Sequence, residues 1–182
     1  ISFRDDIEWL DLNAKLELTA HEAVEMIGPA EPEGIEPGLA IINAPAMWAL
    51  GYTGYGKVTF VNDTGVDPNH PAFKLKYRGH YVEPQQAWFQ YNSSNILPFD
   101  CSDHGTHVLG TMIGLDRIAS DTIGAAFNAL WMGAPILCGI GTEDNIAAFQ
   151  WALDPDGNPG TIDDMPDAIN NSWYDPSLTD PD

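Results

Sequence analysis

An alternation of short apolar strands with helices, from about residue 40 onward, constrains the fold of this chain more than any other feature. Apolar runs at Val58–Val61 and Leu130–Leu137 predict buried strands, and a third short strand is expected at Ala168–Ser172. Pro135 weakens the second prediction, because proline cannot donate to a strand ladder. The alternation is typical of an α/β fold with a mostly parallel sheet.

Three helices are predicted around these strands. The first covers Ala44–Leu50 and is closed by Gly51. The second covers His104–Gly114, where Asp103 occupies a favourable N-cap position. The third covers Glu143–Leu153 and leads into a loop rich in aspartate, proline and glycine.

The first 38 residues differ from the rest and predict an N-terminal extension, which divides the chain into 1–38 and 39–182. Alternating polar and apolar residues from Asp6 to Leu12 indicate a half-buried strand. A short helix is expected over His21–Met26, and an exposed linker over residues 29–38. The 182 residues provide room for one α/β domain with a substantial core.

The charge of the chain excludes several classes of partner. It carries 27 acidic and 7 basic residues, a formal net charge of −20. Such a field repels phosphate, so we expect neither nucleic acid nor an anionic membrane as a partner. No apolar run reaches the roughly 18 residues that a membrane-spanning helix requires, so no membrane insertion is expected. The acidic residues form either a solvated surface or, in part, ligands for calcium.

Two places in the sequence carry residues suited to catalysis. Asp63 directly follows a predicted buried strand, at the carboxyl end of a parallel sheet where ligands and catalytic groups gather. His104 and His107 stand three residues apart at the start of a predicted helix. Gly105 and Gly110 are expected to let this helix approach neighbouring backbone closely.

These two places resemble the motifs of a known family. Val61–Val66 resembles the aspartate motif of the subtilases, and His104–Gly110 resembles their histidine motif, with Leu109 where the family usually has a small residue. The order of aspartate before histidine also matches the order found in subtilisin. Asp167–Trp173 resembles the strand whose end lines the substrate-binding cleft of the family.

Other segments resemble the bacillopeptidase F branch of the subtilases, and the resemblance covers about residues 40–175. These segments are Ala44–Gly51, Lys76–Gly79 and Asn170–Trp173. The resemblance implies a subtilisin-like three-layer α/β fold with a mostly parallel central sheet, of which this chain holds the N-terminal portion. It also implies a secreted, extracellular serine endopeptidase that is made as a zymogen, acts on protein or peptide substrates and undergoes proteolytic processing.

The resemblance assigns roles to individual residues. Asp63 becomes the carboxylate that orients the catalytic imidazole, and His104 the general acid–base. Ser172, Trp173 and Gly141 become substrate-binding residues that flank an extended peptide. His107 is expected to be structural. Tyr174 departs from the family, which usually has glycine after the Ser-Trp pair.

A catalytic serine motif is absent from the printed sequence, and so is the asparagine that the family places in its oxyanion hole. Without its nucleophile the chain has no route to an acyl-enzyme, so this fragment alone is expected to be inactive. We expect the C-terminal remainder of the same protease, as a second chain or a missing segment, to supply both groups. The alternative is a catalytically inactive subtilase-like subunit used for binding.

The resemblance also bears on the N-terminal residues. Residues 4–12 resemble the last strand of an inhibitory propeptide, which makes Ile1–Leu12 either a propeptide remnant or a plain extension.

No cofactor is required by this chemistry, and no metal ligands are assigned. Structural calcium is one expectation for the loop Asp154–Asn158, whose oxygen ligands alternate as in a calcium loop although no glutamate stands at the twelfth position. A solvated surface insertion is the other. Cys101 and Cys138 can form a disulfide, remain thiols or bond to the missing chain.

Overall fold

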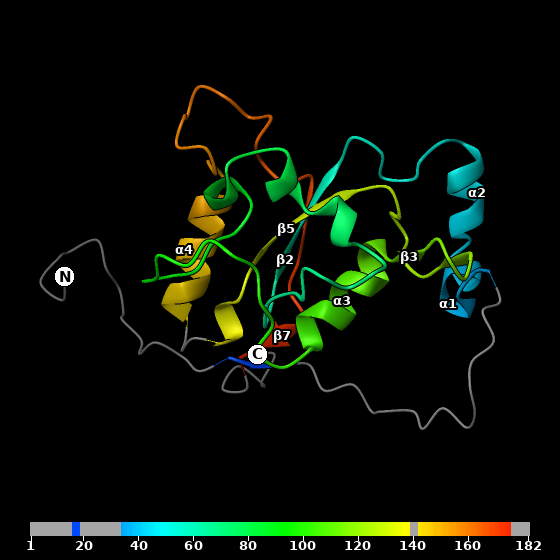
Figure 1. The fold of residues 1–182 in the computed structure, drawn as a ribbon, viewed down its shortest axis with the longest axis horizontal. Helices are drawn as coiled ribbons and strands as arrows, with labels where there is room; N and C mark the ends of the chain where they lie inside the picture. Colours follow the sequence, from blue (N-terminus) through cyan, green and yellow to red (C-terminus); the bar gives the residue numbers. More distant parts are fainter. Residues whose placement is uncertain (1–15, 19–33, 139–141, 176–182) are drawn as a thin grey trace, which may run out of the picture.

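A small parallel sheet lies at the centre of the molecule (Figure 1). The computed structural model describes residues 16–18, 34–138 and 142–175. Strands β5 (Leu130–Ala134), β2 (Val58–Asn62) and β6 (Ala168–Asn170) lie in the order β5-β2-β6, with β2 parallel to both neighbours. Four of the five residues in β2 and in β5 are buried, as expected for strands covered on both faces.

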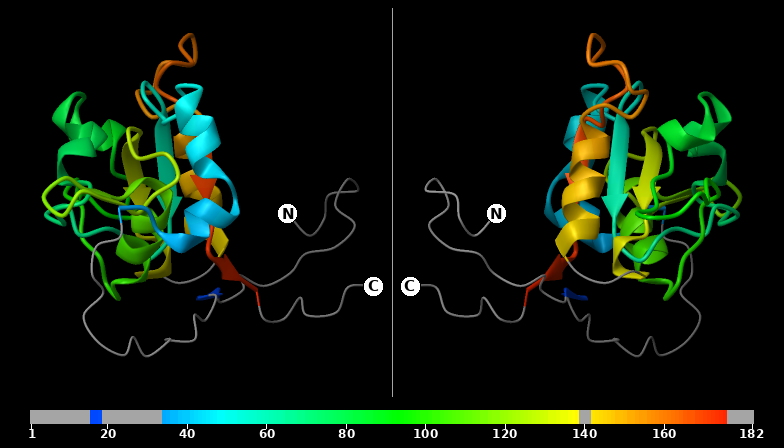
Figure 2. Two further views of the ribbon diagram at one scale, coloured as in Figure 1. Left: turned by 90° about the vertical axis from the view of Figure 1, so that its right-hand side faces the viewer. Right: turned by 90° about the vertical axis from the view of Figure 1, so that its left-hand side faces the viewer.

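Helices cover both faces of this sheet. Helix α4 (Thr142–Ala152) lies on one side of the sheet, and α3 (His104–Ile113) lies on the other, with α1 (Pro37–Ile41) and α2 (Ala44–Ala49) beyond α3 (Figure 1, Figure 2). The three layers, helix, parallel sheet and helix, are the architecture that the sequence predicts.

Irregular segments connect the layers. Between β2 and α3 the chain makes three 3-10 turns, η1 (Lys74–Lys76), η2 (Arg78–His80) and η3 (Pro84–Gln86). After α3, the strands β3 (Leu115–Asp116) and β4 (Asp121–Thr122) pair antiparallel. A last 3-10 turn, η4 (Ile136–Cys138), follows β5.

Large aromatic side chains fill the core between these turns and the sheet. Trp88 and Trp131 are almost fully buried, and the Trp131 indole donates to the Phe73 carbonyl over 3.0 Å. This bond satisfies the only polar atom of a large apolar side chain. Phe73 and Tyr77 pack against Trp131 from the connecting segment, which fixes that segment on the sheet.

Several predicted boundaries hold, and two need correction. Helices α2, α3 and α4 begin and end within one residue of their predicted limits. The strand predicted to reach Leu137 ends at Ala134, because Pro135 cannot donate and the chain turns into η4. The strand predicted over Ala168–Ser172 ends at Asn170.

The N-terminal predictions fall mostly outside the described residues. The strand over residues 6–12 and the helix over residues 21–26 cannot be compared with the structure for that reason. The predicted linker was wrong at its end, because α1 begins at Pro37, a residue that fits the first turn of a helix. Helix α1 therefore crosses the proposed boundary at residues 38 and 39.

Candidate active site

The end of β2 places a carboxylate inside the protein. Asp63 is fully buried, and its backbone N–H continues the ladder to the Ala134 carbonyl over 3.2 Å. The side-chain oxygen Oδ1 accepts the Thr64 N–H over 2.7 Å. A buried carboxylate is costly unless it is paired, so its remaining contacts decide what it does.

The partner of Asp63 is His104, the first residue of α3. His104 Nδ1 lies 2.7 Å from Asp63 Oδ1, and the imidazole is only 12% exposed. Because the carboxylate can only accept, the short bond assigns a proton to Nδ1. The other ring nitrogen, Nε2, is then the one that can take a proton from a reacting group. Two residues 41 positions apart are thereby joined in an arrangement that suits an orienting carboxylate and a base.

Asp100 holds the two halves of this pair together. Its carboxylate accepts from the Thr64 hydroxyl over 2.7 Å, and from both the N–H and the hydroxyl of Thr106, over 2.8 and 2.6 Å. Thr64 Oγ1 in turn accepts the Gly105 N–H over 2.9 Å. The Asp100 carboxylate thus provides the hydrogen-bond acceptor for the Thr106 N–H in the first turn of α3.

The prediction that Asp103 caps α3 was right in position and wrong in mechanism. Asp103 precedes the helix with φ 64°, and its side chain makes no capping hydrogen bond. The sequence missed Asp100 because it lies four residues before His104, beyond the usual N-cap position. Its capacity to accept bonds from residues 64 and 106 together becomes visible only when the two segments meet.

Close backbone contact sets the distance between the two segments. A Cβ added to Gly105 would lie 2.0 Å from the Gly65 carbonyl oxygen, so a side chain there has no room. The expected close approach is confirmed for Gly105. It is wrong for Gly110, where an added Cβ meets no atom of the described residues within 4 Å.

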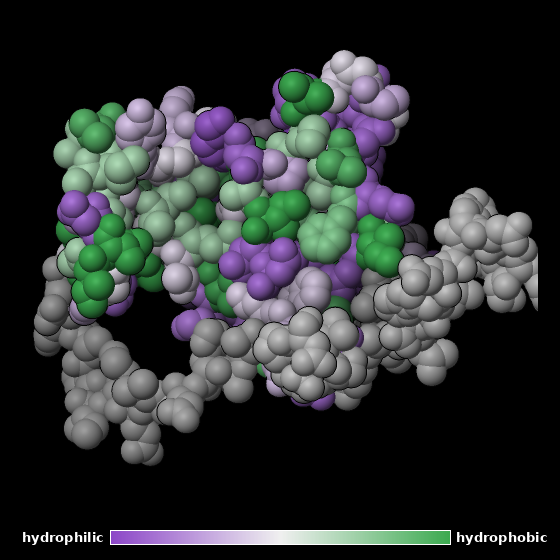
Figure 3. All heavy atoms as spheres, turned by 180° about the vertical axis from the view of Figure 1, so that it is seen from behind, coloured by the Kyte–Doolittle hydropathy of each residue, from purple (hydrophilic) through white to green (hydrophobic). Residues whose placement is uncertain are grey.

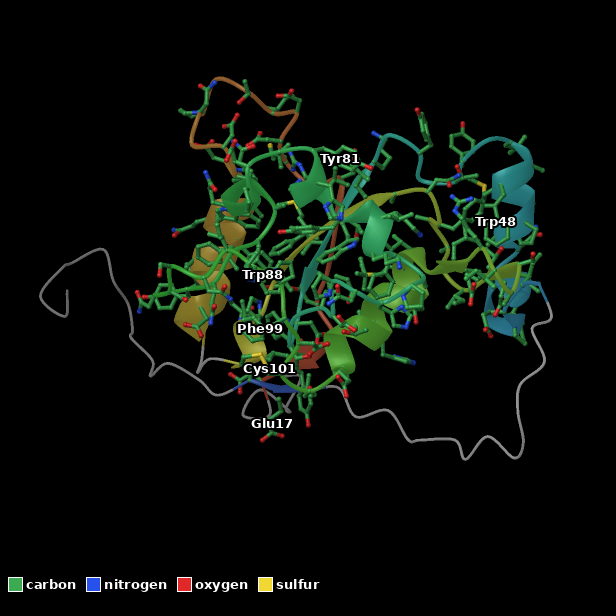
Figure 4. The ribbon with its side chains drawn as sticks, in the orientation of Figure 1. Glu17, Trp48, Tyr81, Trp88, Phe99 and Cys101 are labelled. Atoms are coloured by element: carbon green, nitrogen blue, oxygen red, sulfur yellow. A yellow bond between two sulfur atoms is a disulfide. The ribbon has the colours of Figure 1, made fainter. Side chains whose placement is uncertain are left out.

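A disulfide joins Cys101 to Cys138, with 6.0 Å between the Cα atoms. It links the segment that precedes α3 to η4, which follows β5. Figure 4 labels Cys101 at the end of the sheet where the carboxyl ends of the strands lie. The two cysteines that the sequence left open are therefore bonded to each other, and the bond ties His104 to the sheet.

The residues after β6 approach the same end of the sheet. The Trp173 indole donates to the Asn62 carbonyl over 2.9 Å, next to Asp63. Ser172 Oγ donates to Asn170 Oδ1 over 2.9 Å. His107 and Ser172 line a common hollow of about 160 Å³, together with Val108, Thr111, Met112 and Asn170. Ser172 and Trp173 thus lie beside α3, whereas Gly141 lies outside the described residues.

Asn62 joins β2 to both flanking elements, and sequence reasoning missed it. Its Nδ2 donates to Asn145 Oδ1 of α4 over 2.9 Å and to Asn171 Oδ1 over 3.0 Å. The side chain is fully buried, and these bonds satisfy its amide nitrogen. A polar residue at the end of an apolar strand was the available signal.

A short strand from the N-terminal segment pairs with the residues beside the site. Strand β1 (Glu17–Leu18) is antiparallel to β7 (Trp173–Tyr174), with Leu18 opposite Trp173 and Glu17 opposite Tyr174. Figure 4 labels Glu17 at the same end of the molecule as Cys101. The backbone edge of β7 is therefore able to receive an extended chain.

One group of carboxylates among the described residues could hold a metal ion. Asp154, Asp156 and Asp164 belong to the loop between α4 and β6. This loop projects beyond the other end of the sheet from His104, at the top of Figure 1. It is therefore separate from the candidate active site.

Comparison with known proteins identifies the family. Residues 56–180 match the model of the subtilase family. This chain belongs to the subtilase family. It is 39% identical over 152 residues to bacillopeptidase F of Bacillus subtilis (strain 168), and the match covers 78% of the chain and 10% of that protein. The predicted resemblance to the bacillopeptidase F branch is thereby confirmed.

More distant relatives match this subtilase chain over a similar length. Subtilisin E of Bacillus subtilis is 28% identical over 145 residues, which cover 80% of the chain and 34% of that protein. The CspB protease of Clostridium perfringens superposes with a TM-score of 0.48 and 21% identity, over 63% of this chain and 29% of that one.

The subtilase chain therefore spans about a tenth of bacillopeptidase F and a third of subtilisin E. Its fold is a part of the subtilisin-like α/β fold, with the parallel sheet and helices described above. Membership of the family relates the chain to subtilisin-like serine proteases. No helix among the described residues is long and apolar enough to cross a bilayer.

Proposed function

We propose that this chain is the N-terminal part of the catalytic domain of a secreted subtilisin-type serine endopeptidase, with Asp63 and His104 as two of its three catalytic residues. The observation that carries the proposal is the 2.7 Å contact between His104 Nδ1 and Asp63 Oδ1 at the carboxyl end of β2. Asp63 fixes the imidazole orientation and stabilises the imidazolium that forms. His104 takes the proton of a serine hydroxyl and returns it to the leaving amine.

The serine and an oxyanion-hole donor come from the remainder of the protease, either as a continuing segment or as a second chain. Exposed apolar side chains support the proposal that such a segment or chain packs against this one. Ile169 of the edge strand β6 is 42% exposed, and Ile41 of α1, Met47 of α2 and Ile146 of α4 are also exposed. Figure 3, which views the molecule from behind, shows apolar side chains over both α1–α2 and α4. Apolar surface spread over a sheet edge is typical of an interface.

Substrate peptides bind along the residues after β6, with Ser172 and Trp173 beside the catalytic pair. The pairing of β1 with β7 supports this assignment, because an extended segment already adds a strand there. We propose that the β1 segment of the N-terminal extension holds this place before processing and is displaced by substrate. This gives the extension the part of a propeptide remnant.

An extracellular location follows from the same proposal. The Cys101–Cys138 disulfide supports it, since such bonds persist in oxidising surroundings. One relative at 32% identity is named minor extracellular protease Vpr. The net charge of −20 supports solubility in such a fluid and gives no attraction for nucleic acid.

A fluorophosphonate probe tests the catalytic proposal on the full-length protein. We expect labelling of a serine outside this chain, loss of labelling in His104→Ala, and normal labelling in the control His80→Gln, whose ring is exposed and bonded to the Lys74 carbonyl. The chain 1–182 alone should hydrolyse no peptide. Absence of labelling in the wild-type protein, together with tight binding of a peptide, would instead identify an inactive binding subunit.

A further inference from the structure

The loop between α4 and β6 gathers three carboxylates. Asp154, Asp156 and Asp164 each offer an oxygen, and these oxygens all lie within 4.8 Å of one another. In Figure 4 the loop is the orange segment at the top, where side-chain oxygens point into the curve of the loop. Like charges at such distances repel, so the arrangement is unfavourable without a compensating positive charge.

Two oxygens of this cluster are buried without a hydrogen-bond partner among the described residues. Asp164 is only 5% exposed; its Oδ2 accepts the Asp156 N–H over 3.0 Å, whereas its Oδ1 has no partner. Asp154 Oδ1 is also buried and without a partner. A buried, charged oxygen that lacks a partner is costly, and this makes the cluster more than a group of solvated acids.

Protein cations do not balance the charge. The nearest guanidinium is that of Arg78, itself 6% exposed, and it donates to the backbone carbonyl of Asp164 rather than to a carboxylate of this loop. One guanidinium therefore faces three clustered carboxylates. Asp163, the residue before Asp164, is exposed and adds a further negative charge near Arg78.

We propose that Asp154, Asp156 and Asp164 bind one Ca²⁺ ion. Calcium takes six to eight oxygen ligands in a flexible geometry, and carboxylates that converge from a loop satisfy this need. Sulfur or imidazole ligands that favour zinc do not occur in the group. This loop lacks the glutamate that a calcium loop carries at its twelfth position. The carboxylate of the buried Asp164 takes the place of that glutamate. Asp156 is exposed, which leaves the outer side of the ion to water.

The ion closes the connection that leads to β6. Gly157 has φ 73° and lets the chain turn back between Asp156 and Asp164. Three residues after Asp164, the Asp167 carboxylate accepts from the Val58 N–H over 2.9 Å and pairs with Lys57 over 2.8 Å. Calcium thereby fixes the end of α4 to the start of β6, far from the catalytic pair. The site does not depend on the proposed peptidase activity.

Calcium titration of the full-length protein, after removal of metal with a chelator, tests the site by calorimetry. We expect the double variant Asp154→Asn and Asp164→Asn to bind one ion fewer per chain than the wild type. The control Asp163→Asn removes one negative charge from the same loop, outside the cluster, and should keep the full number of sites. Equal numbers of bound ions in the wild type and the double variant would overturn the proposal.

A single substitution at an exposed residue tests the proposal even if the double variant fails to fold. Asp156→Asn should weaken binding at this site at least tenfold while the protein stays folded. Terbium luminescence excited through tryptophan gives a second readout, since Trp151 lies in the last turn of α4 and its carbonyl accepts the Asp154 N–H over 3.0 Å. We expect a terbium signal that calcium displaces in the wild type and in Asp163→Asn, and that is reduced in Asp156→Asn. An unchanged signal in Asp156→Asn would also overturn the proposal.

Discussion

At the scale of single residues, the bond between Asp63 and His104 gives the first prediction. Asp63→Asn keeps the size of the side chain but presents a donor or a weaker acceptor to Nδ1, which favours the wrong tautomer of His104. In the protease proposed above we expect kcat to fall by about 10⁴, with KM changed by less than about threefold. Steady-state kinetics on a peptide substrate measures both. His80→Gln is the control, and a loss of less than tenfold in Asp63→Asn would refute the assigned role.

Asp100 gives a second prediction at this scale. Its carboxylate accepts bonds from Thr64 and Thr106 that join the segments carrying Asp63 and His104. Asp100→Asn leaves part of these donors without an acceptor and should lower the free energy of unfolding by about 1–3 kcal/mol. Asp103→Asn removes the same charge near the start of α3 but no side-chain bond, so it should cost less than about 0.5 kcal/mol. Urea unfolding compares the two; equal losses would contradict the role of Asp100.

The two aspartates also show what the sequence could predict at this scale. Asp63 and His104 stand in motifs, so their identity and their pairing were predictable. Asp100 accepts a bond from a residue 36 positions away along the chain. Asn62 donates to residues that are at least 83 positions away. No local pattern records such partners, because each side chain alone looks like an ordinary polar residue of a loop or a strand end.

At the scale of elements, α3 keeps its place by direct backbone contact. Gly105→Ala would put a methyl group against the Gly65 carbonyl, so the start of α3 must move away from Asp63. We expect kcat to fall at least about 10²-fold, since a displacement near 1 Å costs this much in catalysis. Stability should fall by about 1–3 kcal/mol. Gly38→Ala in α1, where an added Cβ meets nothing within 4 Å, is the control for both. An active Gly105→Ala enzyme would show that this contact is dispensable.

The disulfide gives the second prediction for elements. Cys101 and Cys138 are 37 residues apart, and their bond restricts the unfolded chain around α3 and β5. Replacing both by serine should lower the free energy of unfolding by about 3–4 kcal/mol in the chain-entropy model. Thermal unfolding of the double variant, with the wild type under reducing conditions alongside, measures this. If the wild type unfolds at the same temperature with and without reductant, the expectation is contradicted.

The elements that the sequence predicted well are those with a strong local pattern. The helix over Ala44–Ala49 and the strand over Val58–Asn62 have clear boundary residues, and both occur. The strand after Leu130 was predicted too long, because an apolar run continues past Pro135 although the ladder cannot. The pairing of β1 with β7 joins residues more than 150 positions apart and had no local signal.

At the scale of the whole molecule, the net charge of −20 sets a field around the candidate cleft. The region after residue 34 holds only five basic residues, which are Lys57, Lys74, Lys76, Arg78 and Arg117. A negative field raises the local concentration of cationic peptides and lowers that of anionic ones. For the active protease we therefore predict a higher kcat/KM on a peptide with flanking lysines than on the same peptide with flanking glutamates.

Salt separates this long-range effect from contacts within the cleft. Raising the ionic strength from about 0.01 M to 0.15 M shortens the screening length from about 30 Å to about 8 Å. The lysine peptide should lose about tenfold in kcat/KM over this range, and the glutamate peptide should gain, because steering of this kind falls steeply with salt. A neutral peptide is the control and should change little. If the preference for lysine persists unchanged at high salt, local contacts set it and the field of the chain does not.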